Sequence, residues 1–356
     1  SSAASDVYKR QLPYSALSGV ITGDMKERNS MSSYRFVAVM VAQFFVQVFM
    51  YPIILKVGEG DKALGIETVM TYLAVIGTVM LLITFFTTKE RIIPKPEQKS
   101  SLRDDISDLT SNLPWVIMLA VTTLLFITLS MKGGSYLYYF ENYVSEDALT
   151  LFIEPIISFL SLIGLNFFGE DPVSAGFGLF NAGGIIFMII GISFSKGLAD
   201  KYGKRDVFSA ALFISTLFIA VFYFFNPKNL SYMFLSQVMH GFFYGLTIPL
   251  LWAMIADVAD YSEWKNNRRA TAIIFSAMMV GLKGGLSIGG ALVASILGNY
   301  GYEPGAEQSI NTLSGIKMLV SVFPSVPFLF CVLLLFFYEI DNKMESKIEI
   351  DLKSKR

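Results

Sequence analysis

Eight long apolar runs constrain the fold of this 356-residue chain more than any other feature. Each run is long enough to cross about 30 Å of hydrocarbon as a helix, because an α-helix rises about 1.5 Å per residue. The sequence therefore predicts an all-α membrane protein with many spans. The runs cover roughly residues 34–56, 68–88, 112–140, 174–196, 207–226, 231–256, 271–298 and 314–338.

The composition agrees with this class and excludes several others. Apolar residues make up 53% of the chain and charged residues only 16%, whereas about a quarter of a soluble domain is charged. Cys331 and His240 are the only cysteine and histidine, which excludes disulfides, thiolate clusters, histidine metal sites and most serine–histidine catalysis. No phosphate loop or nucleophile elbow occurs. We therefore expect no enzyme and no bound cofactor or metal. We also expect no nucleic-acid partner, a point on which the net charge of −1 carries no information.

The first residues predict a truncated start. Residues 1–11 have no initiator methionine and lack the apolar core of a signal peptide, and they resemble a translated cloning adapter, so we exclude them from the fold. The apolar run that follows, 12–22, has about half the length that a span needs. We expect it to be the end of a helix whose first half is missing.

Charge in the connecting segments predicts the orientation. If segment 24–35 is cytoplasmic, the inside segments 24–35, 89–111, 196–206, 257–270 and 339–356 hold twenty lysines and arginines, and the outside segments hold three. This asymmetry orients membrane proteins, and it predicts an inner- or plasma-membrane protein with a cytoplasmic C-terminus. Residues 149–168, interrupted by Glu154-Pro155, cannot then cross, so we expect an interfacial or re-entrant element inserted on the outer face.

The same segments predict the domain organisation. Segment 89–111 contains Pro94, Pro96 and mixed charges, as a central cytoplasmic linker between two helical bundles would. Residues 12–88 would then be the remainder of an N-terminal bundle, and residues 112–340 a C-terminal bundle of six helices. We expect residues 341–356 to be a solvated, charged cytoplasmic tail.

Two lysines lie inside predicted spans, where a charge is costly and usually faces a cavity or a partner. Lys283 is about twelve residues into its span, so we favour a functional role over packing alone. Lys132 is nearer the outer end of its span and could extend its amine outward instead. Gly281, Gly285 and Gly289 recur every four residues beside Lys283, which predicts a face for close helix packing.

The span before the acidic segment carries further polar groups. Gln237, His240 and Tyr244 share one helical face, which either hydrogen bonding within a bundle or a water-filled cavity would explain. Pro249 removes a backbone hydrogen bond and is expected to kink the helix.

Three acids, Asp257, Asp260 and Glu263, follow at the cytoplasmic end of this helix. Carboxylates at a helix C-terminus oppose the helix dipole, so we expect cationic partners for them. Arg268 and Arg269 are close in sequence, and Arg28 and Arg35 lie on the same predicted side. The alternatives are an ordinary solvated helix end and an ion-pair latch that closes the cytoplasmic side.

Two sequence motifs resemble those of known transporters. The predicted loop 197–205 has Gly197, Asp200, Gly203, Lys204 and Arg205 at the spacing of the cytoplasmic loop motif of the major facilitator superfamily. The stretch 256–265, with Arg269 and the run Lys283-Gly284-Gly285, is more specific. It resembles the glycoside–pentoside–hexuronide:cation symporters, the melibiose permease family, and the resemblance covers essentially residues 12–340.

The resemblance implies twelve spans in two bundles, of which this chain would supply the end of helix four through helix twelve. It implies that Lys283 lies in the cavity region and that Arg35 lies at the substrate site, and we add Lys132 and Tyr244 as candidate substrate contacts. The residues that match the family's cytoplasmic charge network, which seals the outward-open state, are Arg28, Asp257, Asp260, Glu263 and Arg269.

The expected function is symport of a sugar or glycoside with a cation, sodium or proton, by alternating access. The family's carboxylates for the cation lie on helices absent from this chain, so we assign no cation-site residue, and we expect a monomer. One alternative is a symporter of the same fold that carries lysolipids or another organic solute. Another is a non-transporting membrane sensor or partner-binding protein.

Overall fold

The computed structural model describes residues 25–59, 61–88, 112–162, 171–266 and 271–355, and it confirms the all-α fold class. In these ranges eight segments are long and apolar enough to cross a membrane. They correspond one to one with the eight predicted runs. The chain divides into two compact units, residues 1–100 and 101–356. The predicted half-helix 12–22 and linker 89–111 lie outside the described residues.

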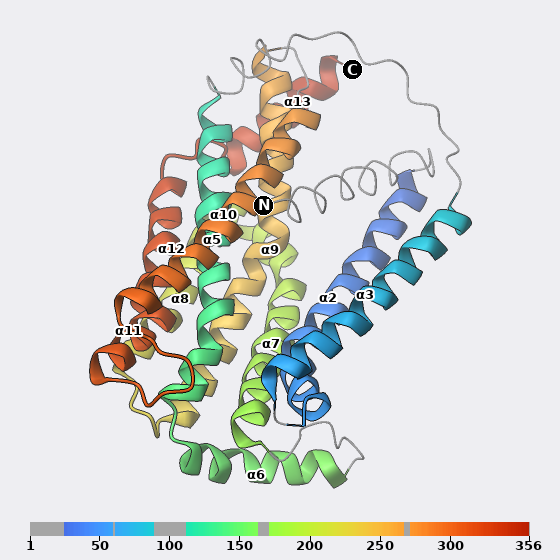
Figure 1. Cartoon of the computed structure of the whole chain (residues 1–356). Helices are drawn as coiled ribbons and strands as arrows, with labels where there is room; N and C mark the ends of the chain where they lie inside the picture. The colour runs from blue at the N-terminus through green and yellow to red at the C-terminus, as the bar shows by residue number, and fades with distance from the viewer. Residues whose placement is uncertain (1–24, 60, 89–111, 163–170, 267–270, 356) are drawn as a thin grey trace. The chain divides into compact units, whose positions relative to one another are not determined.

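The described residues of the first unit form two helices, α2 (Met25–Val57) and α3 (Lys62–Thr87). Asp61 caps α3 by accepting hydrogen bonds from the backbone amides of Ala63 and Leu64. The backbone of α3 at Gly65 lies so close to the Ile54 carbonyl of α2 that a Cβ atom there would overlap it. A short connection and a glycine contact therefore hold the two helices side by side (Figure 1).

In its described residues the second unit is a bundle of segments long enough to cross a membrane, with one helix outside these segments at each end (Figure 1). The short helix α6 (Glu146–Leu162) lies across one end of the bundle, and α13 (Asn342–Lys355) lies at the other. We call these the α6 end and the α13 end. The bundle helices are α5 (Leu113–Asn142), α7 (Pro172–Tyr202), α8 (Lys204–Ala220) continued by η1 (Val221–Phe224), α9 (Leu230–Asn266), α10 (Thr271–Asn299), α11 (Ile310–Val320) and α12 (Val322–Leu335).

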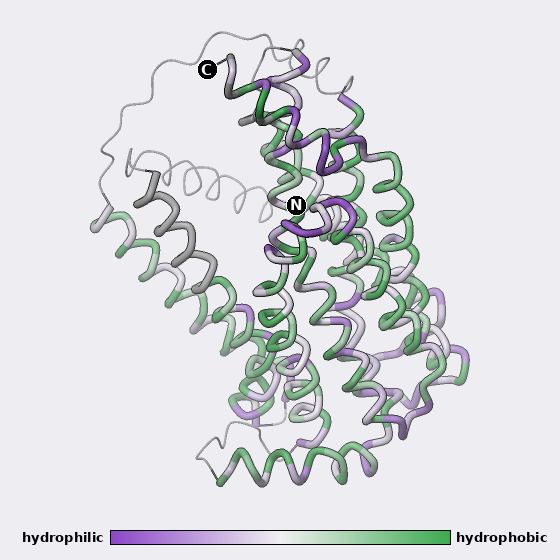
Figure 2. The backbone as a smooth tube through the Cα atoms, turned by 180° about the vertical axis from the view of Figure 1, so that it is seen from behind, coloured by the Kyte–Doolittle hydropathy of each residue, from purple (hydrophilic) through white to green (hydrophobic). Residues whose placement is uncertain are grey.

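Hydropathy along the backbone explains this arrangement (Figure 2). Apolar residues dominate the long helices, and hydrophilic residues gather towards their ends and on α13. Two apolar cores fill the bundle. The one towards the α13 end includes Met118, Phe208 and Met254, and the one towards the α6 end includes Tyr139, Phe180 and Met233.

Glycines bring α10 against α5, as predicted from their spacing. A Cβ atom at Gly281 would lie 2.8 Å from Thr123 Oγ1, and one at Gly289 would lie 2.6 Å from the Ile127 carbonyl. At Gly285 it would overlap the Thr123 carbonyl. Only glycine allows the backbones to approach this closely.

A second glycine contact, which the sequence analysis did not identify, joins α7 to α9. A Cβ atom at Gly241 or Gly245 of α9 would overlap a backbone carbonyl of α7, and one at Gly191 of α7 would overlap the Phe242 carbonyl of α9. The Ser195 hydroxyl donates a 2.8 Å hydrogen bond to the Leu246 carbonyl across the same contact. The glycines thus let α7 and α9 approach as closely as backbone atoms allow.

The predicted span 314–338 is confirmed as one apolar segment, Ile310–Leu335, which Ser321 divides into α11 and α12; Pro324 has no N–H to donate to the Val320 carbonyl. Two other expectations from the sequence were wrong at the level of elements. The predicted loop 197–205 is almost entirely helical: α7 runs to Tyr202 and α8 begins at Lys204, so only Gly203 connects them. The predicted solvated tail is helix α13, which buries Ile348 and Leu352.

Candidate functional site

A half-buried cluster of charges at the α13 end joins three helices. Lys204, the first residue of α8, has its Nζ atom 2.8 Å from both carboxylate oxygens of Asp257 on α9. The same Nζ atom is 2.8 Å from Glu345 Oε1 on α13. We call these three residues the Lys204 cluster. One ammonium group thus bridges two carboxylates that would otherwise repel each other, and it offsets one of their two negative charges.

Backbone geometry at Gly203 positions Lys204. Gly203 has a φ of 90°, which an L side chain rarely adopts, and its amide donates to the Ala199 carbonyl to end α7. A Cβ atom here would also lie 3.3 Å from Asn342 Cβ at the start of α13. The glycine therefore makes the sharp turn that lets α8 start directly beneath α13.

Neighbouring side chains extend the cluster. Arg205 pairs with Asp206 at 2.9 Å and donates a 3.2 Å hydrogen bond to the Tyr338 carbonyl, just before α13. The Tyr338 hydroxyl donates to the Met254 carbonyl at 3.3 Å. Burial, followed by the nearby carboxylates of Asp257 and Glu345, raises the pKa of Tyr338 well above its ordinary value. The phenol therefore stays protonated and remains a donor.

Aromatic residues of α9 hold the outer half of α13. Trp264 Nε1 donates a 2.8 Å hydrogen bond to Asp351, and the Lys347 amine lies 5.6 Å from the centre of the Trp264 ring. The Tyr261 hydroxyl is 3.4 Å from Glu339 Oε2. Together with the buried Ile348 and Leu352 side chains, these contacts make α13 part of the packed end of the bundle.

The structure brings together two features that the sequence analysis treated separately. Among the described residues Asp257 has a cationic partner, Lys204 of the 197–205 motif, which the sequence had not paired with it. Asp260 and Glu263 lie on the same end of α9 and also make contacts. Gly197 and Asp200 are exposed in the last turns of α7. The Arg28 and Arg35 side chains on α2, and Arg269, lie outside the described residues.

Glu345 was missed because the tail was expected to be solvated. Met344, Ile348 and Leu352 repeat every four residues in a segment of otherwise polar residues. This spacing is typical of the apolar face of a helix. It would have predicted a docked helix and placed Glu345 beside that face.

Several of the predicted polar residues meet in the interior of the second unit. Lys132 on α5 is only 6% exposed, and its amine lies 5.2 Å from the centre of the Tyr136 ring. His240 Nδ1 on α9 is 2.8 Å from Ser215 Oγ on α8. Tyr244 stacks on the His240 ring and on Phe328 of α12, with interplanar angles of 10° and 14°. Lys132 and Tyr244 therefore pack among the helices of their own bundle.

Some polar atoms in this interior have no hydrogen-bond partner among the residues that the structure describes. The Tyr136 hydroxyl and Gln237 Oε1 are buried without a hydrogen-bond partner among them. In the same ranges Lys132 forms no ion pair. Ordered water commonly binds such groups in protein interiors. The polar face of α9 had two explanations, hydrogen bonding within the bundle and a water-filled cavity. Hydrogen bonding within the bundle accounts for His240. It does not account for Gln237 Oε1, which has no such bond among the described residues.

Lys283 lies on the opposite side of α10 from the glycine face. Residues two positions apart on a helix differ by about 200°, and Gly281 and Gly285 both face α5. The lysine is half-buried and points away from α5. The glycine contact therefore does not hold Lys283 against α5; it directs the lysine to the other face of the helix.

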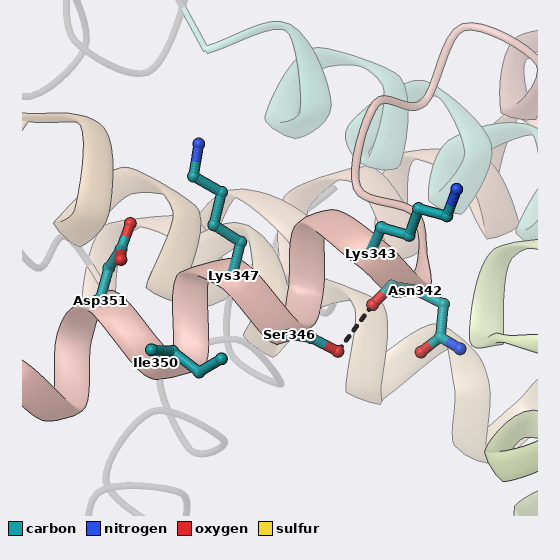
Figure 3. Close-up of a pocket in the computed structure, with 6 residues that line it drawn as sticks. All are labelled: Asn342, Lys343, Ser346, Lys347, Ile350 and Asp351. Carbon is teal, nitrogen blue, oxygen red and sulfur yellow. Dashed lines mark hydrogen bonds between the residues drawn. The ribbon is translucent and has the colours of Figure 1, made fainter.

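A shallow depression on α13 does not qualify as a substrate site. It has a volume of about 480 Å³, and all six residues that line it come from α13: Asn342, Lys343, Ser346, Lys347, Ile350 and Asp351. Figure 3 shows them along one helix, with the Ser346 hydroxyl donating to the Asn342 carbonyl. A site for a sugar would need polar groups converging from several helices. In the described ranges no three metal-ligating side chains group together either.

Comparison with known proteins identifies relatives along nearly the whole chain. A family profile described as MFS/sugar transport protein matches residues 9–170 and 158–342. The chain is 31% identical over 320 residues to the inner membrane symporter YicJ of Escherichia coli, a match that covers 89% of the chain and 62% of YicJ. The chain thus spans less than two thirds of the length of that relative.

Two further relatives have names that indicate their cargo. YagG of Escherichia coli, provisionally named a glycoside/cation symporter, is 28% identical over 337 residues, which cover 94% of the chain and 67% of YagG. The isoprimeverose transporter of Lactiplantibacillus pentosus is 24% identical over 348 residues, which cover 97% of the chain and 67% of that transporter.

Proposed function

Because this chain belongs to the glycoside–pentoside–hexuronide:cation symporter family of the major facilitator superfamily, we propose that the full-length protein carries a sugar or glycoside together with a cation by alternating access. The family consists of transporters and not of enzymes. The names of YagG and of the isoprimeverose transporter support a glycoside as cargo. Sodium and the proton are the two proposed coupling ions.

The structural observation that carries this proposal is Lys283. It lies near the middle of α10, a helix that is long and apolar enough to span the membrane. The glycine contact with α5 turns the lysine to the opposite face. A lysine held at this depth usually faces a cavity or a partner. We propose that Lys283, with Arg35, contacts substrate hydroxyls or a substrate carboxylate.

Lys132 and Tyr244 have a less direct proposed role. Both pack inside the second unit, against Tyr136 and against His240 and Phe328 respectively. From there they would support the wall of the substrate cavity from behind.

The Lys204 cluster is the proposed cytoplasmic latch of the second unit. Its ion pairs tie the start of α8 to α9 and α13, and an ion-pair network that forms in one state and breaks in another biases an alternating equilibrium. In this proposal Asp260, Glu263, Arg28 and Arg269 belong to the same gate. The α13 end would then face the cytoplasm, as the distribution of positive charge favours.

Uptake by the full-length protein in proteoliposomes tests the function. We expect radiolabelled isoprimeverose or a related glycoside to accumulate when an inward sodium or proton gradient is imposed. Lys283→Ala should abolish uptake while membrane insertion persists. Gly284→Ala is the matched control, because a Cβ atom at Gly284 meets nothing within 4 Å, and it should transport normally.

Other outcomes would redirect the proposal. Normal coupled uptake by the Lys283→Ala variant would remove Lys283 from the site. Uptake of lysolipid or another organic solute, with no uptake of any sugar, would change the cargo. No uptake of any of these solutes by the unsubstituted protein would favour the sensor or partner-binding alternative.

A further inference from the structure

Helix α6 differs in length and direction from the candidate membrane spans of the bundle, which have 21 to 36 residues. With 17 residues it would extend about 25 Å, which is too short to cross about 30 Å of hydrocarbon. It runs across the end of the bundle while the long helices run along it (Figure 1). A helix in this orientation lies roughly parallel to the membrane plane, because the bundle helices cross that plane.

One face of α6 packs on the bundle. Leu149 and Ile153, four residues apart, are fully buried. A Cβ atom at Gly176 of α7 would lie 2.7 Å from a methyl group of Leu149, so the glycine leaves the space that the leucine fills. The Ser145 amide, directly before α6, donates a 3.0 Å hydrogen bond to the Pro227 carbonyl. These contacts fix α6 against the ends of α7 and α9.

A second face of α6 is apolar and uncovered. Leu151, Phe159 and Leu162 are 72%, 63% and 83% exposed, and Pro155 between them is also exposed. Positions 151, 155, 159 and 162 follow the three- and four-residue spacing of one helical face. We call these four residues the α6 apolar strip. Contact of this strip with water would be unfavourable, because the transfer of apolar surface out of water lowers the free energy.

A third face of α6 is polar. It consists of exposed residues that follow the same helical spacing: Asp147, Thr150, Glu154, Ser158 and Ser161. This polar strip and the apolar strip flank the packed face on opposite sides. A helix with adjacent apolar and polar sides, lying parallel to the membrane, is typical of the membrane–water interface.

Tyrosines at the α6 end also indicate that α6 lies at the depth of the membrane–water interface. Tyr143 caps α5, Tyr223 lies in η1, Tyr232 lies at the start of α9, and Tyr302 follows α10. The Tyr143 hydroxyl donates to the Phe225 carbonyl at 3.0 Å. Tyrosine is enriched where membrane helices meet the headgroup region. Helix α6 starts three residues after Tyr143, so it starts at the depth of this belt.

We propose that the α6 apolar strip is embedded in the membrane interface at this end of the bundle, among lipid headgroups and the first acyl carbons. The polar strip faces water, and Leu149 and Ile153 couple the embedded helix to α7. Residues 146–162 contain three acids and no lysine or arginine. Insertion therefore depends on apolar burial and not on attraction to anionic lipids.

Spin labels on the two strips test this placement in the full chain. The single native cysteine, Cys331, is buried and leaves the background unlabelled. Leu151→Cys, Phe159→Cys and Leu162→Cys report on the apolar strip, and Glu154→Cys, Ser158→Cys and Ser161→Cys are the matched positions on the polar strip. The protein is reconstituted in vesicles of phosphatidylethanolamine and phosphatidylglycerol, and label accessibility to oxygen and to a water-soluble nickel complex is measured.

We expect oxygen to relax the apolar-strip labels more than the nickel complex does, with the reverse order on the polar strip. A higher phosphatidylglycerol content should leave this pattern unchanged. Nickel access at all six positions would show that the strip is in water. Labels immobilised and inaccessible to both reagents would show a protein partner or a second copy instead, and oxygen access at all six would show a re-entrant segment. Each of these three results overturns the proposal.

Every substituted residue is exposed, so the labelled chains should keep the unsubstituted Tm, which checks their folding. Deeper insertion with more phosphatidylglycerol would contradict the apolar basis of binding. The measurement requires no transport, so its outcome is independent of the proposed function.

Discussion

At the scale of single residues, Lys204 is the charge on which three helices depend. Replacing it with methionine leaves Asp257 and Glu345 half-buried, close together and without their shared partner. We expect Lys204→Met to cost about 1–3 kcal/mol of stability, since hydrogen bonds to charged groups contribute that much when partly buried. The Tm of the purified protein in detergent should fall by several degrees.

Asp206 provides the control at the same scale. It pairs with Arg205 at a similar distance, but its side chain is 63% exposed. Because exposed pairs contribute little, Asp206→Asn should change stability by no more than about 0.5 kcal/mol. If Lys204→Met and the unsubstituted protein had equal Tm values, the Lys204 cluster would not stabilise the protein in detergent.

At the scale of elements, the α5–α10 contact depends on the absence of a side chain. A Cβ atom at Gly285 would overlap the Thr123 carbonyl and lie 3.0 Å from Phe126 Cβ. Gly285→Ala should therefore push the helices apart and destabilise the protein by about 1–3 kcal/mol, as overpacking does. Gly284→Ala, one position away in open space, should be neutral or stabilising by up to about 1 kcal/mol, because alanine favours helix. Thermal unfolding of both variants would compare them, and equal Tm values would contradict the glycine contact.

The docking of α13 can be tested with two isoleucines on the same helix. Ile348 is 4% exposed and Ile350 is 68% exposed. Ile348→Asp would bury a charge against α9, so we expect α13 to detach and trypsin to cleave after Lys343 and Lys347 much faster. Ile350→Asp should leave the cleavage rate unchanged. Mass spectrometry of the fragments distinguishes the two, and equal protection in both variants would show that α13 does not depend on this face.

The elements also show how far the sequence could predict this structure. All eight spans were predictable, because about 20 consecutive apolar residues leave few other folds. Helix α13 was predictable only from the four-residue spacing of its apolar residues, because these few residues do not raise the mean hydropathy of the segment. The α7–α9 glycine contact and the pairing of Lys204 with Asp257 join residues about 50 positions apart. Which helices pack together decides such pairs, and a single sequence does not contain that information.

Some features of the candidate site could likewise be predicted from the sequence, and others could not. Lys283 could be singled out because a charge inside an apolar run is rare, and the spacing of the glycines predicted a packing face correctly. The direction of Lys132 and Tyr244 could not be predicted, since the side of α5 and α9 that faces the interior depends on the positions of α8 and α12. Ser215, the partner of His240, has no distinguishing sequence context.

At the scale of the whole molecule, the distribution of positive charge predicts which end faces the cytoplasm. Lysines and arginines are concentrated at the α13 end, and they are rare in the connections at the α6 end. We therefore expect Asn226→Cys, exposed at the α6 end, to react with a membrane-impermeant maleimide in intact cells. Ser346→Cys on α13 should react only after permeabilisation. Buried Cys331 adds no background. Labelling of Ser346→Cys in intact cells would invert the orientation, and the Lys204 cluster could then no longer be a cytoplasmic latch, because it would close the opposite side of the membrane.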